Sequence, residues 1–385
     1  MAELADIFRL HGPEYLAAFS DRLPAGHKRA MRDIAGCRTP VFGGSLHACP
    51  HCPDILTYSY HSCGNRSCPK CQNGEASDWI AKQAQLLLPT RYFLVTVTLP
   101  EECRAVARSN QRAVYDAFFR GSAQAILGLC GRRKHLGGLA GLMGVLQTWR
   151  RDMGYHPHIH FVVPGGALSP DGARWITPRY RDWLIPEKAL AALVKLRFKE
   201  ELAKLGLLAQ VPPAVWKRDK KWVADCIPAG TGEAALKYLS AYIFRAAITN
   251  NRIERDEGGK VTYRYKDGKT GRWQHHTVPA AEFIRLFLQH VLPRGFVKVR
   301  YYGFLAAKNR KAMLPPIREL LAAARNAGAG KADAEPPAPA AANPHKHEFL
   351  CPRCHAVMVL VARIPRQLTA RAPPPSPAAE PERAA

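Results

Sequence analysis

The sequence predicts an α+β fold, with an antiparallel sheet flanked by helices and a small zinc-ribbon-like domain at the N-terminal side. Runs rich in β-branched and aromatic residues recur along the chain, and short turns containing glycine separate two pairs of them, which is typical of β-hairpins. Two Cys-x2-Cys pairs precede these runs and indicate a zinc-binding segment.

The expected elements follow in mixed order along the chain. Expected strands cover residues 92–99, 142–149, 158–163, 221–227, 261–265 and 272–278. Expected helices cover residues 13–23, 78–88, 101–129, 186–205, 232–248, 280–291 and 316–325. The segment 328–344 and the end of the chain beyond residue 371 are rich in Ala, Pro and Gly, which predicts disorder. We therefore expect a helix and a zinc-binding domain over 1–90, a larger domain of strands and helices over 91–325, and a disordered tail with one Cys-x2-Cys over 326–385.

The charge balance favours nucleic acid as the partner. The chain has 56 Lys and Arg against 31 acidic residues, a formal net charge of +25, and such an excess favours a polyanion. No stretch approaches the roughly 18 consecutive apolar residues of a membrane helix, and the first residues do not read as a secretory signal. We expect a cytoplasmic, nucleoid-associated protein with reduced thiols, no membrane partner and no small-molecule substrate.

The cysteines indicate at least one structural zinc ion. Cys49 and Cys52 form one Cys-x2-Cys knuckle, Cys68 and Cys71 form another, and 15 residues separate the two. Four thiolates close a tetrahedral shell, so the ion would stabilise the fold rather than bind substrate. Further cysteines and histidines lie near these knuckles, and spacing alone leaves the ligand set of a second ion open. Its candidate ligands are Cys37, Cys63 and His61, and the late pair Cys351 and Cys354 could form half of another site.

Two histidines in one expected strand form a candidate site for a divalent cation. Alternation along the strand places His158 and His160 on one face, with their roots about 7 Å apart, so both imidazoles can reach one ion. A straight strand puts His156 about 13 Å from His160, too far to share that ion, so the third ligand should come from a neighbouring element. His156 is instead a candidate DNA-binding residue. Gln147, on the preceding strand of the hairpin, is the candidate third ligand.

Two tyrosines in one expected helix are candidate nucleophiles. Tyr238 and Tyr242 stand four residues apart, which places both on one face, and Arg245 shares this face as a candidate phosphate ligand. A phenol, with a pKa near 10, needs a polarised electrophile at neutral pH. A cation held by the histidines would polarise a scissile phosphate in this way. The alternative is an aromatic pair packed in the core.

These residues belong to an ordered series of blocks that resembles a known family. The blocks are 37–39, 63–72, 98–100, 147–149, 156–166, 238–242, 245–250, 290–293 and 302–303. In this order they resemble the rolling-circle insertion-sequence transposases of the two-tyrosine HUH type, named for a His–hydrophobic–His motif. The resemblance covers residues 37–320, almost the whole chain, and includes the N-terminal transposase zinc-binding domain.

The resemblance implies a fold, two kinds of metal and a substrate. It implies an antiparallel HUH endonuclease sheet with the histidines on a central strand and the tyrosine helix beside it, and a structural Zn²⁺. His158 and His160 would hold Mg²⁺ or Mn²⁺, with Gln147 where the family tends to have His, and Tyr238 and Tyr242 would cleave DNA. Single-stranded DNA at the element ends and target DNA are the implied partners. A rolling-circle replication initiator and a non-catalytic zinc-dependent DNA-binding protein are the alternatives.

Overall fold

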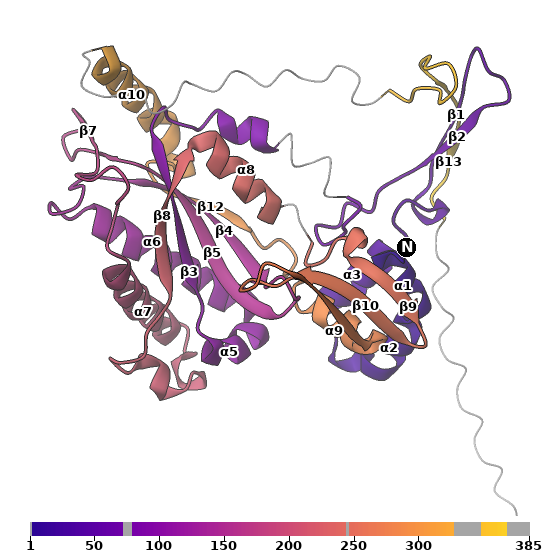
Figure 1. The fold of residues 1–385 in the computed structure, drawn as a ribbon, viewed down its shortest axis with the longest axis horizontal. Coiled ribbons are helices and arrows are strands. Elements are labelled where there is room, and N and C mark those ends of the chain that lie inside the picture. Colours follow the sequence, from indigo (N-terminus) through magenta and orange to yellow (C-terminus); the bar gives the residue numbers. More distant parts are fainter. Residues whose placement is uncertain (1, 72–78, 244–245, 327–347, 368–385) are drawn as a thin grey trace, which may run out of the picture.

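A five-stranded antiparallel sheet lies at the centre of the largest lobe, in a computed structural model that describes residues 2–71, 79–243, 246–326 and 348–367 (Figure 1). Its strand order is β12-β4-β5-β3-β8, and all four pairings are antiparallel. The strands are β3 (Arg91–Thr98), β4 (Gly141–Trp149), β5 (Tyr155–Pro164), β8 (Ala224–Thr231) and β12 (Val299–Gly303). The α+β class is confirmed, and β5 is the middle strand.

Helices cover both faces of this sheet because apolar side chains alternate to both sides of its strands. On one face, Val95, Ile159 and Phe161 pack into a core with α6 (Gln111–Cys130) and α7 (Glu187–Lys204). On the opposite face, α8 (Gly232–Ile243) covers a second core. That core consists of Tyr92, Leu94, Met143, Val145, Val162, Ala235, Leu236 and Leu239. Strands with both faces covered read as nearly continuous apolar runs, as residues 92–99 do.

A second lobe combines the start of the chain with a later segment. The first three helices are α1 (Leu4–Leu10), α2 (Gly12–Phe19) and α3 (Ala25–Ala35). They pack with α9 (Ala280–Leu288) and with the sheet β11-β10-β9, formed by β9 (Ile253–Glu257), β10 (Lys260–Lys266) and β11 (Trp273–Pro279). Phe8 and Phe287 meet in this core with ring centroids 5.5 Å apart. The expected boundary at residue 90 therefore does not separate two cores, because the N-terminal helices bury their apolar faces against residues 246–291.

A small three-stranded sheet projects from the rest of the molecule at the upper right of Figure 1. Its order is β13-β1-β2, from β1 (Gly44–Ala48), β2 (Leu56–Tyr60) and β13 (Val359–Ile364), and both pairings are antiparallel. Residues 348–367 lie within the expected disordered tail, so that expectation is wrong for them. The backbone of β13 finds its hydrogen-bond partners on β1, more than 300 residues earlier, and local composition carries no sign of this pairing.

Several helix limits differ from those expected. The expected helix 101–129 is divided at Asn110, whose backbone leaves the helical region (φ −129°, ψ 45°), into α5 (Arg104–Ser109) and α6. The last helix, α10 (Ala307–Asn326), starts before the expected residue 316 and contains Pro315 and Pro316. The short strands β6 (Ala167–Leu168) and β7 (Trp175–Ile176) also pair outside the expected set.

The described helices can be compared with the length and apolarity that a membrane span requires. None of those described is both long and apolar enough to span a bilayer.

A substitution of Gly303, at the end of β12, would test how closely this edge strand packs. The φ of Gly303 is +63°, and a Cβ there would overlap the carbonyl oxygen of Ala140. Gly172 has a similar φ of +72° with open space around it, so it is the matched control. We expect Gly172→Ala to lower the free energy of unfolding by about 1–2 kcal/mol, the penalty for the left-handed backbone alone. Gly303→Ala should cost clearly more, by at least about 2 kcal/mol beyond the control, because backbone must move. Urea denaturation gives both values, and equal costs would contradict the close approach.

Candidate active site and cysteine clusters

The strand register gathers the candidate cation ligands on the sheet face that α8 covers. His158 pairs with Gln147 of β4 on one side and with Thr98 of β3 on the other, and His160 pairs with Thr96. Directly paired residues of antiparallel strands point to the same face. The imidazole centroids of His158 and His160 are 4.8 Å apart. The structure therefore brings together the three side chains that the sequence predicted as ligands of one cation.

Hydrogen bonds from the protein orient both imidazoles. Nδ1 of His158 donates to the carbonyl oxygen of His156 at 2.7 Å, because a carbonyl can only accept, and in the neutral ring this leaves the lone pair on Nε2. Nδ1 of His160 lies 3.0 Å from Oγ1 of Thr96. Neighbouring groups that fix the ring and its tautomer in this way are typical of metal-binding histidines.

Gln147 presents a buried oxygen to the same place. Its Nε2 donates to the carbonyl oxygen of Trp149 at 3.0 Å, which turns the amide so that Oε1 is the remaining polar atom. Oε1 is buried and has no hydrogen-bond partner among the described residues. A buried acceptor without a donor is costly unless something else binds it. Two imidazole nitrogens and one amide oxygen fit a divalent cation that keeps open positions for oxygen ligands.

Burial keeps these imidazoles uncharged at neutral pH. Desolvation lowers the pKa of His158, lowers the pKa of His160 to about 3, and lowers the pKa of His156 to about 4. A neutral imidazole has a lone pair for a metal, whereas a protonated one does not. The lowered pKa values therefore leave these rings neutral, each with a lone pair, at physiological pH.

The tyrosine helix places one candidate nucleophile beside the imidazole pair. The ring of Tyr238 meets the ring of His160 edge to face, with centroids 6.0 Å apart, and Tyr238 is 42% exposed. It is therefore not an aromatic side chain enclosed by the core. Tyr242 lies one turn further along α8, and its side chain lies outside what the structure describes. Arg245 also lies outside the described residues.

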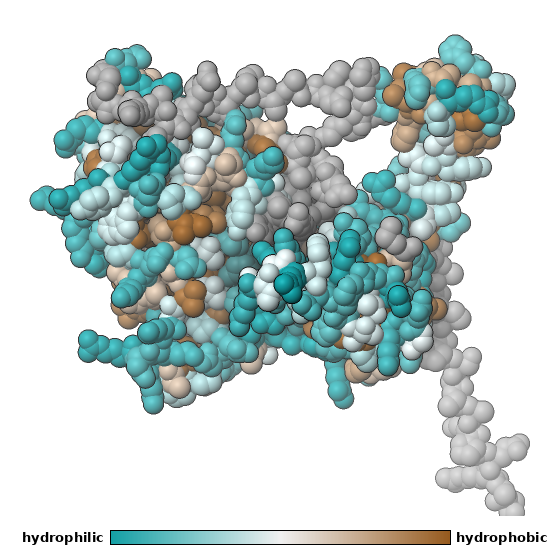
Figure 2. Space-filling model, viewed as in Figure 1, coloured by the Kyte–Doolittle hydropathy of each residue, from teal (hydrophilic) through white to brown (hydrophobic). Residues whose placement is uncertain are grey.

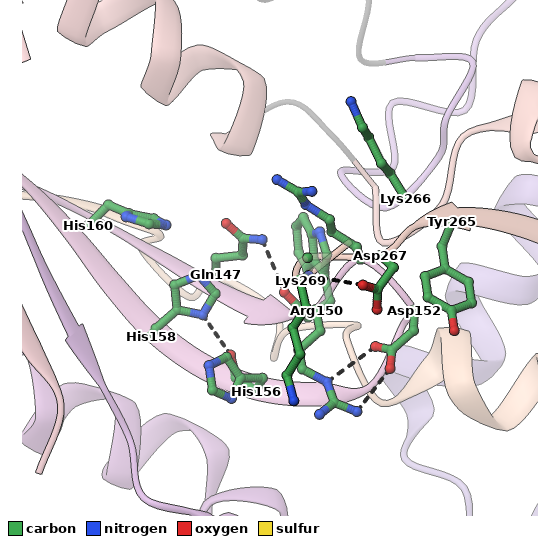
Figure 3. A pocket seen from close by; sticks show the side chains of 13 residues that line it. Gln147, Arg150, Asp152, His156, His158, His160, Tyr265, Lys266, Asp267 and Lys269 are labelled. Carbon is green, nitrogen blue, oxygen red and sulfur yellow. Dashed lines mark hydrogen bonds and ion pairs between the residues drawn. The ribbon is translucent and has the colours of Figure 1, made fainter. Parts of the chain in front are cut away.

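A basic pocket of about 490 Å³ opens over the histidines (Figure 3). The end of β4 and the following loop form one wall, and the turn between β10 and β11 forms the other. Four cationic residues line it, namely Arg150, Arg151, Lys266 and Lys269, along with His156. The sequence predicted the hairpin around Asp267 and Gly268 but gave it no role. The sequence feature that could have indicated a role is the pair Lys266 and Lys269 at this turn. Only the tertiary fold brings these two lysines to the site.

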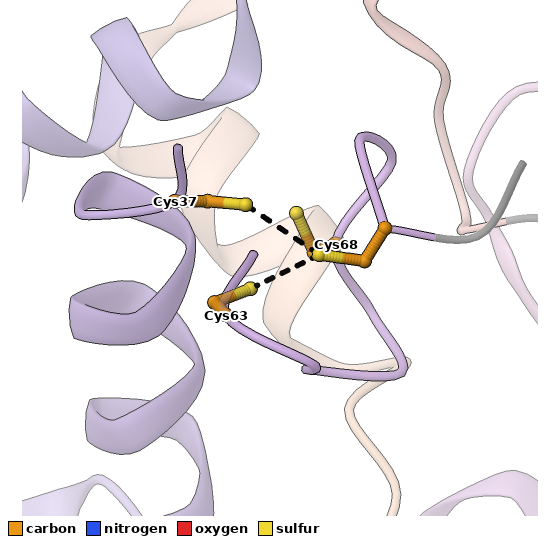
Figure 4. A group of neighbouring side chains, drawn as sticks. Cys37, Cys63 and Cys68 are labelled. Carbon is orange, nitrogen blue, oxygen red and sulfur yellow. Dashed lines mark hydrogen bonds between the residues drawn. The ribbon is translucent and has the colours of Figure 1, made fainter. Parts of the chain in front are cut away.

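The first cysteine cluster consists of Cys37, Cys63, Cys68 and Cys71, and Figure 4 shows how the chain segments converge there. The four sulfur atoms lie within 4.8 Å of one another, and Sγ of Cys71 is 3.5 Å from both Cys37 and Cys63. A tetrahedral zinc site with Zn–S bonds of about 2.3 Å has sulfurs about 3.8 Å apart. The cluster therefore fits a structural zinc ion, and His61 is not part of it.

The second cluster corrects the predicted ligand set. Cys49 and Cys52 do not join Cys68 and Cys71 but meet Cys351 and Cys354, with all four sulfurs within 4.8 Å. The physical reason is the β1–β2 hairpin. Cys49 follows the last residue of β1, so the knuckle lies at the outer end of a strand about 17 Å long, away from the base where Cys68 lies. Cys37 and Cys63 complete the first cluster in their place.

A buried histidine supports the hairpin that carries the site. Nε2 of His290 donates to the carbonyl oxygen of Met153 at 2.9 Å, and Nδ1 accepts from Oγ1 of Thr148 at 3.1 Å. Met153 itself adopts a left-handed backbone (φ +62°) in the β4–β5 turn. Burial lowers the pKa of His290 to about 4, so the ring is neutral at pH 7. The ring connects Met153 of the turn to Thr148, the residue that follows Gln147.

Comparison with known proteins identifies relatives over most of the chain. A family model described as "Transposase zinc-binding domain" matches residues 7–99, and another described as "Putative transposase" matches residues 141–312. The chain is 38% identical over 337 residues to "Putative transposase y4qJ" of Sinorhizobium fredii, covering 83% of the chain and 84% of that relative. It is 26% identical over 350 residues to "Transposase for insertion sequence element IS801" of Pseudomonas savastanoi pv. phaseolicola, covering 86% and 82%.

The buried state of His290 predicts a pH-dependent stability. Its pKa of about 4 in the fold lies below the 6.5 of an exposed histidine, so the unfolded chain takes up a proton first as pH falls. The stability from His290 is therefore complete above pH 6.5 and is lost as pH falls towards 4. His290→Asn should lower the free energy of unfolding at pH 7.5, and this deficit should shrink by about 2 kcal/mol at pH 5.0. Urea titrations at both pH values measure it, and a constant deficit would contradict the assignment.

Proposed function

The chain belongs to the insertion-sequence transposases that carry a transposase zinc-binding domain, and we propose that it cleaves and joins single-stranded DNA through 5′-phosphotyrosine intermediates. A transposase transfers DNA strands, so the substrate is DNA and the activity is strand transfer. The observation that carries the finer proposal is the phenol of Tyr238 against the imidazole of His160, at a face where three metal-binding groups meet.

The chain's own residues prepare the scissile phosphate. Nε2 of His158, the imidazole of His160 and Oε1 of Gln147 would hold Mg²⁺ or Mn²⁺. When bound, such a cation draws negative charge from a phosphate and orients it for in-line attack. The carbonyl of His156 and the hydroxyl of Thr96 keep the rings in place, so that no reorganisation is needed when the substrate arrives.

Attack by tyrosine replaces one phosphate ester bond with another. The hydroxyl oxygen of Tyr238 forms a bond to phosphorus, the bond from phosphorus to the 3′ oxygen breaks, and the tyrosine proton passes to solvent while the 3′ oxygen gains one. The products are a 5′-phosphotyrosine and a free 3′ hydroxyl, so rejoining needs no ATP. Tyr242, four residues later on α8, is the proposed second nucleophile. Two tyrosines permit two successive cleavages, which is the requirement of rolling-circle transposition.

A neighbouring pocket supports binding of a single strand. It has a volume of about 500 Å³ and shares Gln147, Trp149, Arg151 and Lys266 with the basic pocket. Trp273 lines it, is 53% exposed, and lies 5.0 Å beneath the guanidinium of Arg264. An exposed indole beside cationic side chains is a stacking platform for an unpaired base. His156, which lines the basic pocket, and Arg245 remain proposed DNA ligands.

The nucleophile assignment predicts which variants lose covalent DNA adducts. Incubation of the full chain with Mn²⁺ and labelled single-stranded DNA from its element's ends should give protein-linked DNA. Tyr238→Phe/Tyr242→Phe should reduce adducts by at least about 1,000-fold, because no phenol oxygen remains to attack. Tyr180→Phe, which alters an exposed tyrosine beside Trp183, is the matched control and should keep full activity. Adducts that persist in the double variant would refute tyrosine as the nucleophile, and binding without any adduct in the native chain would favour a non-catalytic DNA-binding protein.

The basic pocket predicts a salt-dependent affinity. A plot of log K against log salt for single-stranded DNA should be steep and negative, with each phosphate contact adding about 0.7 to its slope. Lys266→Ala/Lys269→Ala should therefore reduce the slope by about 1.4 if both lysines contact phosphate. Lys260→Ala, at the opposite end of β10, is the control and should leave the slope unchanged. An unchanged slope in the pocket variant would place the DNA elsewhere.

A further inference from the structure

Two segments far apart in the sequence meet at the second cysteine cluster. We propose that Cys49, Cys52, Cys351 and Cys354 bind a second zinc ion that fastens the C-terminal segment 348–367 to the N-terminal sheet. The site is structural, because four thiolates fill a tetrahedral shell and leave no position for substrate. It lies partly outside both matched family ranges, since residues 348–367 belong to neither, and it does not depend on the proposed DNA chemistry.

The sulfur geometry fits a metal, and the four cysteines are not joined by disulfides. All four sulfurs lie within 4.8 Å of one another, and Sγ of Cys49 is 3.5 Å from Sγ of Cys354. Zinc–sulfur bonds of about 2.3 Å in a tetrahedron require sulfurs about 3.8 Å apart, whereas a disulfide requires about 2.05 Å. The four thiols are free and face one centre, as one ion requires.

Backbone hydrogen bonds pin both halves of the site. In the first knuckle, the N–H of Cys49 donates to the carbonyl of Ile55 at 3.2 Å, and the N–H of Ile55 donates to the carbonyl of Cys52 at 2.9 Å. In the second, the N–H of Cys351 donates to the carbonyl of Ala356 at 2.8 Å, and His355 turns the chain with a positive φ of 59°. Each knuckle thus presents two sulfurs on one side without help from the other knuckle.

The small sheet needs the ion because its apolar side chains are largely exposed. Among the described residues of this lobe, the core at the cluster consists of three cysteines and Met358, with Ile55 packed against it. Tyr58 of β2 and Val359 of β13 are each 58% exposed, and Figure 2 shows hydrophobic residues on the surface of this region. A sheet that buries so little apolar area is marginal in water. Metal binding then supplies most of its folding free energy.

One ion pair also crosses between the knuckles, and it is too weak to replace the metal. The guanidinium of Arg353 makes two hydrogen bonds to the carboxylate of Asp54, at 2.9 and 2.7 Å. Both side chains are more than half exposed, so water and salt screen their attraction. The ion would therefore add to the hydrogen bonds of the β1–β13 pairing and to the contact between the rings of His47 and Phe349, whose centroids are 4.3 Å apart.

Zinc content and hydrogen exchange test the proposal together. The purified full chain should contain two zinc ions, and Cys351→Ser/Cys354→Ser should contain one. Loss of the second ion should speed amide exchange in β1 and β13 by at least about tenfold, because β13 is released. Exchange in the central sheet should not change, and this shows that the variant has folded. Cys226→Ser, which removes a thiol of β8 outside both clusters, is the control and should keep two ions.

Three outcomes overturn the proposal. One zinc ion in the native chain, or two in Cys351→Ser/Cys354→Ser, would mean that the second cluster holds no zinc. A variant with one ion whose β1 and β13 amides exchange at the native rate would mean that the metal does not fasten the C-terminal segment. If the variant fails to fold, a chelator titration of the native chain gives the same readout, since exchange in β1 and β13 should rise as the second ion leaves.

Discussion

The two-residue period of β5 is the constraint on which the site depends. Ile159 and Phe161 point into the core with α6 and α7, so His158 and His160 must point to the face beneath α8. A slip of one residue would exchange the two sets, removing large apolar side chains from the core and burying imidazoles among hydrocarbon. Each such side chain contributes about 1.5–3 kcal/mol when buried, so the register is strongly fixed. The packing of Ile159 and Phe161 on one face thus fixes the positions of His158 and His160 on the other.

A short chain of contacts connects the candidate cation ligands to the tyrosine helix. The amide of Gln147 is anchored on the carbonyl of Trp149, whose ring lies 5.0 Å from Nζ of Lys298. Lys298 donates to the carbonyl of Ile243 at 3.1 Å, at the C-terminal end of α8, where a positive charge is favourable. Burial lowers the pKa of Lys298 to about 7. One lysine therefore contacts both the end of β4 and the end of the helix that carries Tyr238.

Local patterns in the sequence predicted the central hairpin and the tyrosine helix, but they did not predict the contacts between segments that are distant in the chain. The β4–β5 hairpin and the spacing of Tyr238 and Tyr242 are short-range signals, since alternation and helical periodicity are properties of neighbouring residues. The meeting of Tyr238 with His160 required knowledge of the family's fold, because the two lie on separate elements. Three features carried no local signal at all. The pairing of β12 with β4, the shared core of α1–α3 with β9–β11, and the division of the cysteines between two clusters each depend on contacts between distant segments.

The pairing of β13 with β1 also sets the order in which the protein can mature. A ribosome adds about 5–20 residues per second, so the knuckle at Cys49 waits roughly 15–60 s before Cys351 emerges, 302 positions later. Throughout that time β1 has one unpaired edge and its knuckle supplies only two of four thiolates. The hairpin is thus vulnerable to oxidation and to pairing with other nascent chains until synthesis is nearly complete. Translation speed and the supply of zinc at that moment become determinants of how much native protein a cell obtains.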